Sequence, residues 1–245
     1  PKWELIFSSE MKDAHFEDEV RAWASFYDAL ILRTAEEGLV ARAAEICDEF
    51  GYDTPFINAG DGKGEHPTQT LLDTLALFSG LGLDIERDWR KLSGLSIAFL
   101  NDGKNSRTIH SLARVLGSKK LFGMFLIFIS YPGFEIPQSL REEFIAEDYD
   151  FLEAHELMPA DAYYVTRNQS EYGEEAKCFS VTPKVADEYG VKIVMHPFPR
   201  SKNGNELPIW LPSKPETHSV SLDKDSRAMY FKQMELGVPV SMALL

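Results

Sequence analysis

Four arginines each lie at or just beyond the end of an apolar run typical of a buried strand: Arg33, Arg107, Arg167 and Arg200. The chain has 25 Lys+Arg against 39 Asp+Glu and a formal net charge of −14. In so acidic a chain, cations at all four positions are not readily explained as ordinary surface charges. Planar guanidinium groups bind carboxylates and phosphates through two parallel hydrogen bonds. The pattern predicts a substrate with two or more anionic groups.

A glycine-rich loop separates the apolar run Pro55–Asn58 from a helix expected to begin at Pro67. Glycines let the backbone turn tightly, and proline suits a first helical position because its missing N–H would be unpaired there. His66 and Gln69 then lie at the helix N-terminus, where free N–H groups and the helix dipole favour an anion or a polarised oxygen. The alternative, a loop with a capping histidine, is less consistent with this spacing.

Short apolar runs alternate with amphipathic segments along the chain. The expected strands are Ala29–Leu32, Pro55–Asn58, Leu95–Leu100, Phe122–Phe128, Ala162–Thr166 and Lys192–Met195. The expected helices are Phe16–Tyr27, Glu36–Phe50, Pro67–Phe78, Ser106–Leu116, Gln138–Ala146, Lys184–Tyr189 and Lys224–Leu236. Parallel strands need crossover connections, so this alternation predicts a parallel α/β fold. Such sheets bind ligands beyond the carboxyl ends of their strands.

Two irregular stretches interrupt the alternation. Gly80–Gly94 is polar and contains glycine, which predicts a domain junction. Ser201–Lys224 holds three prolines and shows no clear period. Because long loops in compact domains tend to be functional, the second stretch is a candidate lid.

Composition excludes several classes of protein. Hydrophobic residues make up 44% and charged residues 26%, as in ordinary globular domains. The acidic balance argues against a nucleic-acid surface. Cys47 and Cys178 form no disulfide or metal-binding framework, which favours the cytoplasm. The longest apolar run, Leu121–Ile129, is too short for a bilayer, which takes about 20 residues, so no membrane segment is expected.

Several motifs in order carry a family resemblance. Asn58-Ala59-Gly60-Asp61-Gly62 is followed by His66-Pro67-Thr68-Gln69-Thr70-Leu71-Leu72-Asp73, Arg107-Thr108-Ile109-His110-Ser111-Leu112, Thr166-Arg167-Asn168-Gln169, His196-Pro197-Phe198-Pro199-Arg200 and Tyr230-Phe231-Lys232-Gln233. Together they resemble the signature of the aspartate carbamoyltransferases. Ornithine enzymes carry a cysteine after the corresponding histidine, whereas here Pro197 follows His196. The aspartate branch is therefore favoured.

The resemblance implies two three-layer α/β/α domains with parallel sheets, the first of them incomplete. Residues 1–88 would bind carbamoyl phosphate, and residues 89–245 would bind aspartate and include the start of a C-terminal return helix near Met242. The family's phosphate-binding run Ser-Thr-Arg-Thr-Arg does not occur in the chain and would lie upstream of Pro1.

The implied reaction is transfer of the carbamoyl group from carbamoyl phosphate to L-aspartate, as in pyrimidine biosynthesis, without a metal or organic cofactor. Arg33, His66 and Lys12 are the implied catalytic residues, with His66 acting as a neutral hydrogen-bond donor. The resemblance assigns carbamoyl phosphate to Ser8, Lys12, Arg33, His66, Gln69, Phe198 and Pro199, and L-aspartate to Lys12, Arg107, Arg167 and Gln169. Ser8 and Lys12 would come from a neighbouring subunit of a homotrimer, and a regulatory or pyrimidine-pathway partner would be possible.

The chain also departs from the family pattern. Asn101 stands where the family has glycine before Asp102, Phe198 replaces a leucine, and Asp13-Ala14 follows Lys12 in place of Gly-Glu. Two alternatives therefore stay open: a catalytically silent homologue that acts as a trimeric scaffold, and a transcarbamylase with another amine acceptor. The retained set of polar and basic residues favours activity.

Overall fold

The computed structural model describes residues 15–62, 64–167 and 177–244. The chain forms two compact units, Pro1–Pro67 and Thr68–Leu245. All strand pairs within the described sheets are parallel, and helices connect successive strands except β5 and β6, which a loop joins. The α/β fold class expected from the sequence is confirmed.

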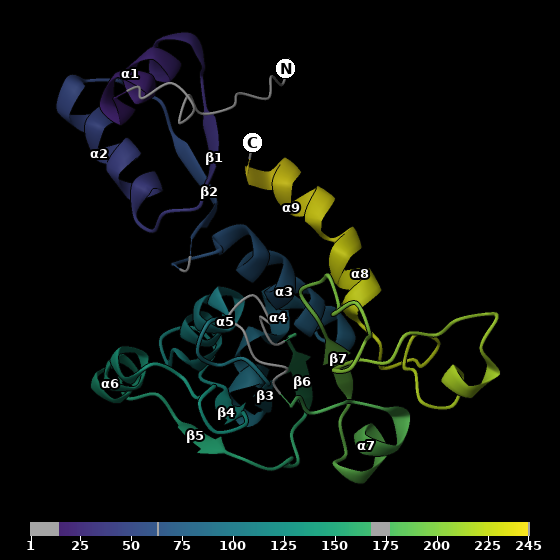
Figure 1. Cartoon of the computed structure of the whole chain (residues 1–245). Coiled ribbons are helices and arrows are strands. Elements are labelled where there is room, and N and C mark those ends of the chain that lie inside the picture. Colours follow the sequence, from purple (N-terminus) through teal and green to yellow (C-terminus); the bar gives the residue numbers. More distant parts are fainter. Residues whose placement is uncertain (1–14, 63, 168–176, 245) are drawn as a thin grey trace. The chain divides into compact units, whose positions relative to one another are not determined.

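Over residues 15–62 and 64–67, the first unit contains a two-stranded sheet and two helices (Figure 1). Its elements are α1 (Phe16–Phe26), β1 (Leu30–Thr34), α2 (Leu39–Phe50) and β2 (Phe56–Asp61). Its core joins apolar residues of both helices to one face of the sheet: Val20, Ala24, Ala43, Ile46 and Cys47, with Leu32 and Phe56 packed against them. Ile31 and Arg33 alternate with Leu30 and Leu32 along β1 and are exposed, so Arg33 lies on the sheet face away from this core.

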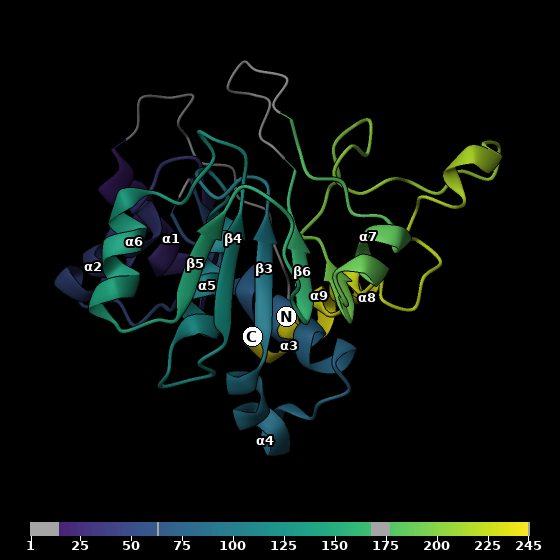
Figure 2. The same ribbon diagram turned by 90° about the horizontal axis from the view of Figure 1, so that it is seen from below.

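The second unit is built on a five-stranded sheet in the order β5-β4-β3-β6-β7. Figure 2 shows the arrows of β5, β4, β3 and β6 side by side and pointing the same way. The strands are β3 (Ser96–Leu100), β4 (Phe125–Ile129), β5 (Phe151–Ala154), β6 (Ala162–Val165) and β7 (Ile193–Met195). The three central strands are almost entirely buried, as expected for a sheet covered on both faces.

Helices and loops cover both faces of this sheet. One face packs Phe99, Phe128 and Tyr164 against apolar residues of the helices α3 (Pro67–Gly80), α5 (Arg107–Gly117) and α6 (Gln138–Ala146). The other face packs Tyr163 and Val194 against α7 (Pro183–Glu188), against the first residue of α8 (Tyr230–Glu235) and against loop residues. The remaining helical elements are α4 (Ile85–Asp88), the 3-10 helices η2 (Trp89–Gly94) and η4 (Pro215–Thr217), and α9 (Gly237–Leu244).

Two of the differences from the predicted elements have local causes, and a third concerns the last helix. Strand β5 was not expected because it has only four residues, one of them charged: it is an edge strand whose Glu153 forms a bidentate pair with Arg141, at 2.6 and 2.9 Å. Helix α8 begins at Tyr230 rather than Lys224 because Asp225 instead accepts a turn hydrogen bond from the Arg227 N–H. Helix α9 begins at Gly237, before the expected position near Met242.

The stretch Gly80–Gly94, expected as a domain junction, is part of the second unit. It forms α4 and η2, and its Leu92 is fully buried in the same core as Ala76, Leu77 and Phe78 of α3. The packing of α3 on the second sheet explains why the compact units divide at Pro67, ahead of the expected boundary at 88/89. The assignment of residues 1–88 and 89–245 to two substrates stays a prediction.

The stretch Ser201–Lys224 is irregular apart from η4, as predicted. Among the described residues, none of the helices has both the length and the apolar character that a bilayer crossing requires.

Candidate functional site

The strand order of the second unit contains one point where the winding of the chain reverses. From β3 the chain proceeds outward through β4 to β5, and from β6 it proceeds in the opposite direction to β7. Ligands of open α/β sheets bind beyond the carboxyl ends of the strands at such a switch point. The candidate site is therefore formed by the described residues that directly follow β3, β6 and β7.

Arg107 and Arg167 lie on the two sides of this switch point. Arg107 is the first residue of α5, beyond β3, and Arg167 follows Thr166 just beyond β6. The two strands are neighbours, with Leu100 in register with Val165. The fold thus brings two predicted aspartate ligands to adjacent strand ends, an arrangement that suits a ligand with two anionic groups. Gln169, the third one predicted on this side, lies outside the described residues.

Buried polar groups fix the turn that precedes Arg107. Asp102 is fully buried and accepts hydrogen bonds from the Asn105 N–H at 2.9 Å and from its side-chain amide at 3.1 Å. The Nε2 atom of His110 lies 2.7 Å from the carbonyl oxygen of Gly103. These contacts tie the end of β3 to the first turns of α5, so they determine where Arg107 starts the helix.

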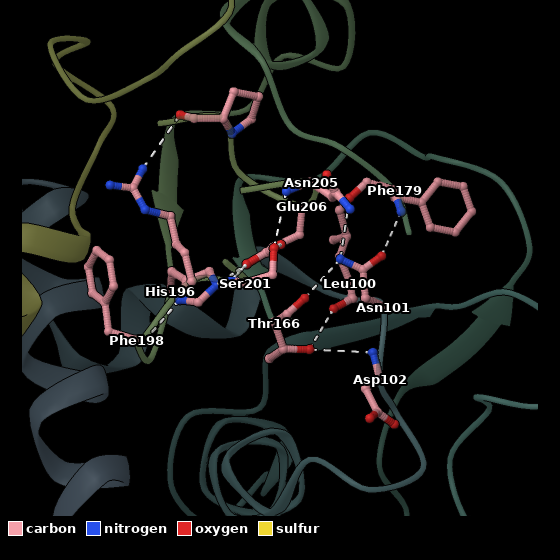
Figure 3. Close-up of polar contacts among 12 residues, drawn as sticks. Leu100, Asn101, Asp102, Thr166, Phe179, His196, Phe198, Ser201, Asn205 and Glu206 are labelled. Carbon is pink, nitrogen blue, oxygen red and sulfur yellow. Dashed lines mark hydrogen bonds and ion pairs between the residues drawn. The ribbon is translucent and has the colours of Figure 1, made fainter. Parts of the chain in front are cut away.

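A buried imidazole and a buried carboxylate occupy the end of β7 (Figure 3). The Nδ1 atom of His196 accepts a hydrogen bond from the Phe198 N–H at 2.9 Å, so the proton of the neutral ring is on Nε2. That atom lies 3.4 Å from Oε1 of Glu206, at an angle that does not make a hydrogen bond. Burial lowers the pKa of His196, although Glu206 partly opposes this effect. His196 is therefore neutral and positions the backbone of Phe198.

Glu206 is held ionised by its neighbours. The N–H of Ser201 donates to Oε1 at 2.6 Å, and the Ser201 hydroxyl donates to Oε2. Burial alone would raise the pKa of Glu206, but His196 and Ser201 together lower it to about 2. This carboxylate anchors the start of the loop that follows Phe198 and Pro199, both of which are predicted carbamoyl phosphate ligands.

Replacing Glu206 by glutamine is expected to lower the free energy of unfolding at neutral pH by about 1–3 kcal/mol, because the N–H and the hydroxyl of Ser201 lose a charged acceptor. The pKa of Glu206 is lower in the folded than in the unfolded chain, so its contribution is full above about pH 4.5 and is lost as the pH falls towards 2. Urea denaturation of wild type and E206Q from pH 7 to pH 3 measures both effects. An equal difference between the two proteins at all pH values would contradict this account.

Arg200 does not join the other strand-end arginines as an anion ligand. Its Nη1 and Nη2 atoms lie 2.6 and 3.2 Å from the two carboxylate oxygens of Asp223. Asp223 also accepts hydrogen bonds from the Trp210 N–H and the Tyr230 hydroxyl. The expectation that this guanidinium belongs to the substrate-binding cluster is corrected: the pair closes the base of the loop between Arg200 and Asp223.

A buried carboxylate on α3 was missed by the sequence analysis. Asp73 is fully buried and accepts hydrogen bonds from Nε2 of Gln69 at 2.8 Å, Nε2 of Gln233 at 2.5 Å and the hydroxyl of Tyr164 at 2.6 Å. Oε1 of Gln233 in turn accepts the N–H of His196 at 3.1 Å. Asp73 thus links the predicted ligand Gln69 to β6, α8 and the end of β7. Its spacing of four residues from Gln69 on one helix face was the available signal.

The glycine-rich loop of the first unit is organised by Asp61. Its Oδ1 atom accepts the Glu65 N–H at 2.6 Å and its Oδ2 atom accepts the Gly38 N–H at 3.3 Å. Gly62 has a φ of +52°, and a Cβ there would lie 2.5 Å from the carbonyl oxygen of Ala35, so this position requires glycine. The loop leads to half-buried His66, which directly precedes α3 as predicted.

The remaining predicted residues have the following places. Arg33 is the second-last residue of strand β1 and is exposed within the first unit. Ser8 and Lys12 lie outside the described residues. The predicted roles of all three stay predictions.

Sequence comparisons identify relatives along nearly the whole chain. The family described as aspartate/ornithine carbamoyltransferase, carbamoyl-P binding domain, matches residues 3–78. The aspartate carbamoyltransferase catalytic subunit of Archaeoglobus fulgidus is 34% identical over 246 residues, which cover 97% of this chain and 72% of the relative. A multifunctional protein CAD of Squalus acanthias is 35% identical over 253 residues, covering 97% of this chain and 10% of the relative.

Solved structures with the same fold include two aspartate transcarbamoylases. The enzyme from Trypanosoma cruzi in complex with carbamoyl phosphate and aspartate is 29% identical with a TM-score of 0.75, over 99% of this chain and 72% of that one. The catalytic subunit from M. jannaschii is 29% identical with a TM-score of 0.73, over 96% of this chain and 70% of that one.

Proposed function

Because the chain belongs to the aspartate carbamoyltransferase family, we propose that it transfers the carbamoyl group of carbamoyl phosphate to the amine of L-aspartate. The products are N-carbamoyl-L-aspartate and phosphate. The observation that carries this proposal is the pair of arginines, Arg107 and Arg167, at adjacent strand ends on the two sides of the switch point. The relatives named for the same reaction support it.

L-Aspartate is the proposed ligand of these two arginines. Each of its carboxylates matches the geometry of a guanidinium group, and the pair discriminates a dicarboxylic amino acid from one with a single carboxylate. Gln169 and Lys12 complete the proposed set of aspartate ligands. The acidic chain repels anions in general, so local cations supply the attraction.

Carbamoyl phosphate is the proposed ligand of Ser8, Lys12, Arg33, His66, Gln69, Phe198 and Pro199. Arg33, His66 and Lys12 act on the reacting groups: attack of the amine places negative charge on the carbonyl oxygen and then on the leaving phosphate. Donors arranged in advance around such charge lower the barrier, and loss of one typically costs about 3–4 kcal/mol. His66 acts as a neutral donor, because a helix N-terminus disfavours a charged imidazolium.

The reaction balances without a side-chain base. The nitrogen of aspartate forms a bond to the carbamoyl carbon while the bond from that carbon to the phosphate oxygen breaks. The departing phosphate accepts the proton that the amine loses. The proposed work of the protein is therefore to align two anionic substrates and to stabilise the developing charge.

We assign residues 1–88 to carbamoyl phosphate binding and residues 89–245 to aspartate binding. The proposed assembly is a homotrimer in which Ser8 and Lys12 act in the site of the neighbouring subunit. We place this assembly in the cytoplasm, where a regulatory or pyrimidine-pathway protein is a candidate partner. Sedimentation of the purified protein tests the trimer: a single species of three times the chain mass is expected, and a monomer at assay concentration would contradict it.

The reaction is tested with ¹³C-labelled carbamoyl phosphate and a panel of amine acceptors, using ¹³C NMR of the products. We expect carbamoyl aspartate with L-aspartate and no product with L-ornithine or L-alanine, because both lack a second carboxylate. Product with another acceptor and not with L-aspartate would replace the proposed acceptor. No product with any acceptor would support the scaffold alternative.

A further inference from the structure

Asn101 is a buried asparagine in an unusual backbone conformation at the carboxyl end of the central strand β3. It is 1% exposed and has a φ of +85°, in the left-handed region that asparagine tolerates better than most residues with a side chain. The family pattern has glycine here. A glycine would satisfy the backbone alone, so the asparagine side chain calls for a separate explanation.

The side chain of Asn101 bonds the backbone at Thr166 and the backbone at Phe179 (Figure 3). Its Nδ2 atom donates to the carbonyl oxygen of Thr166 at 2.9 Å and to that of Phe179 at 3.3 Å. Its Oδ1 atom accepts the N–H of Phe179 at 2.7 Å. Thr166 immediately precedes Arg167, and Phe179 lies twelve residues beyond it in the sequence. We call these three residues the Asn101 clamp.

The clamp requires an amide. A single group must donate to a carbonyl and accept from an N–H, and only an amide side chain of this length does both at adjacent atoms. With glycine at this position, the carbonyl of buried Thr166 loses its amide partner, and an unpaired buried polar group costs more than the hydrogen bond itself contributes. With aspartate, a carboxylate oxygen would face two carbonyl oxygens.

Other contacts of the same residues make the clamp rigid. The Thr166 hydroxyl donates to the carbonyl of Leu100 at 2.9 Å, and the ring of Phe179 stacks on Tyr131 with centroids 4.5 Å apart. The first contact holds Thr166 at the end of β3, and the second holds Phe179 against Tyr131, which lies just beyond the end of β4. The backbone at Thr166, next to Arg167, and the backbone at Phe179 are thus bonded to one side chain at the end of the neighbouring strand.

We propose that Asn101 is a positioning residue that holds Arg167 in the orientation that binds a substrate carboxylate. This inference rests on the proposed function, in which that carboxylate belongs to L-aspartate. Asn101 touches neither substrate. It restricts the backbone next to Arg167 before the substrate binds, so that less conformational entropy is lost on binding. Preorganisation of this kind acts on affinity rather than on the chemical step.

Kinetics of N101G test the functional part of the inference. We expect the KM for L-aspartate to rise about 10-fold, with kcat and the KM for carbamoyl phosphate changed less than about 2-fold, since the lost contact orders only Arg167. N101D should raise the same KM further because of repulsion between oxygens. The matched control is D148G, which removes an exposed side chain at another residue in the left-handed region, with a φ of +57°. Asp148 precedes the amino end of β5, whereas Asn101 follows the carboxyl end of β3. D148G should leave all constants unchanged.

Amide hydrogen exchange of the ligand-free protein tests the clamp without catalysis. In N101G we expect faster exchange in peptides that contain Thr166 and Phe179, and no change there in D148G. Unchanged exchange together with an unchanged KM for L-aspartate in N101G would overturn the inference. Faster exchange with an unchanged KM would overturn the link to Arg167. A wild type that forms no carbamoyl aspartate would refute the proposed function, while the exchange result would still decide whether the clamp exists.

Discussion

Replacing Arg107 by alanine is expected to lower kcat/KM for L-aspartate by about 100- to 1,000-fold, the range seen when one charge-assisted ligand of a reacting substrate is removed. Arg107 starts α5 directly beyond the turn built on Asp102, so its guanidinium is carried by a rigid element. The KM for carbamoyl phosphate should change little, because Arg107 is assigned to the other substrate. R107K should recover only part of the loss, since an ammonium lacks the planar fork.

The control for this prediction lies on the same helix. Arg114 forms a bidentate pair with Glu143, with both side chains about one-third exposed. R114A removes the same side chain from α5 and should leave steady-state kinetics unchanged, with a loss of stability of about 1 kcal/mol or less. If R107A and R114A had the same kinetic constants, Arg107 would not be a substrate ligand.

Replacing Asp73 by alanine is expected to be the most destabilising of these substitutions, with a loss of about 3 kcal/mol or more in the free energy of unfolding. The change leaves the donors of Gln69, Gln233 and Tyr164 without their common acceptor inside the protein. Urea denaturation followed by circular dichroism measures the loss. D148A is the control, because that side chain is 90% exposed and its ion pair with Lys119 is a surface pair. Equal losses in D73A and D148A would contradict the role given to Asp73.

Because of Asp73, we also expect the free energy of unfolding to depend on pH in the direction opposite to that expected from Glu206. Burial raises the pKa of Asp73 to about 7, although the hydrogen bonds from Tyr164, Gln233 and Gln69 oppose the rise. Between its ordinary value near 3.8 and about 7, the folded protein holds a proton that the unfolded chain has released. The free energy of unfolding should therefore fall as the pH rises through this interval. The fall should be smaller in D73N, whose side chain does not titrate; an identical slope in both proteins would rule out this assignment.

The sequence predicted the parallel α/β class because buried strands are uniformly apolar and helices are amphipathic. Helix α6 begins and ends where expected, and β3 and β6 differ by one residue. The edge strand β5 was missed because only one side of an edge strand pairs, so charged residues such as Glu153 are tolerated there. The local sequence pattern therefore located the central strands and the edge strand β7, and it missed the edge strand β5.

The candidate site was predicted less completely than the fold. Arg107 and Arg167 were found because their positions after apolar runs imply a shared edge of the sheet. Arg200 has the same position in the sequence and a different role, since its partner Asp223 is brought to it only by a long loop. Asp73 and the Asn101 clamp depend on contacts between residues far apart in the chain, for which a single sequence carries little signal.

The most direct test of the central claim is a crystal structure of the protein with N-(phosphonacetyl)-L-aspartate, a molecule that carries a phosphonate and both free carboxylates of aspartate. We predict that its carboxylates bind Arg107 and Arg167 beyond the ends of β3 and β6. Binding with both carboxylates away from these two side chains would contradict the assignment of the switch point as the aspartate site.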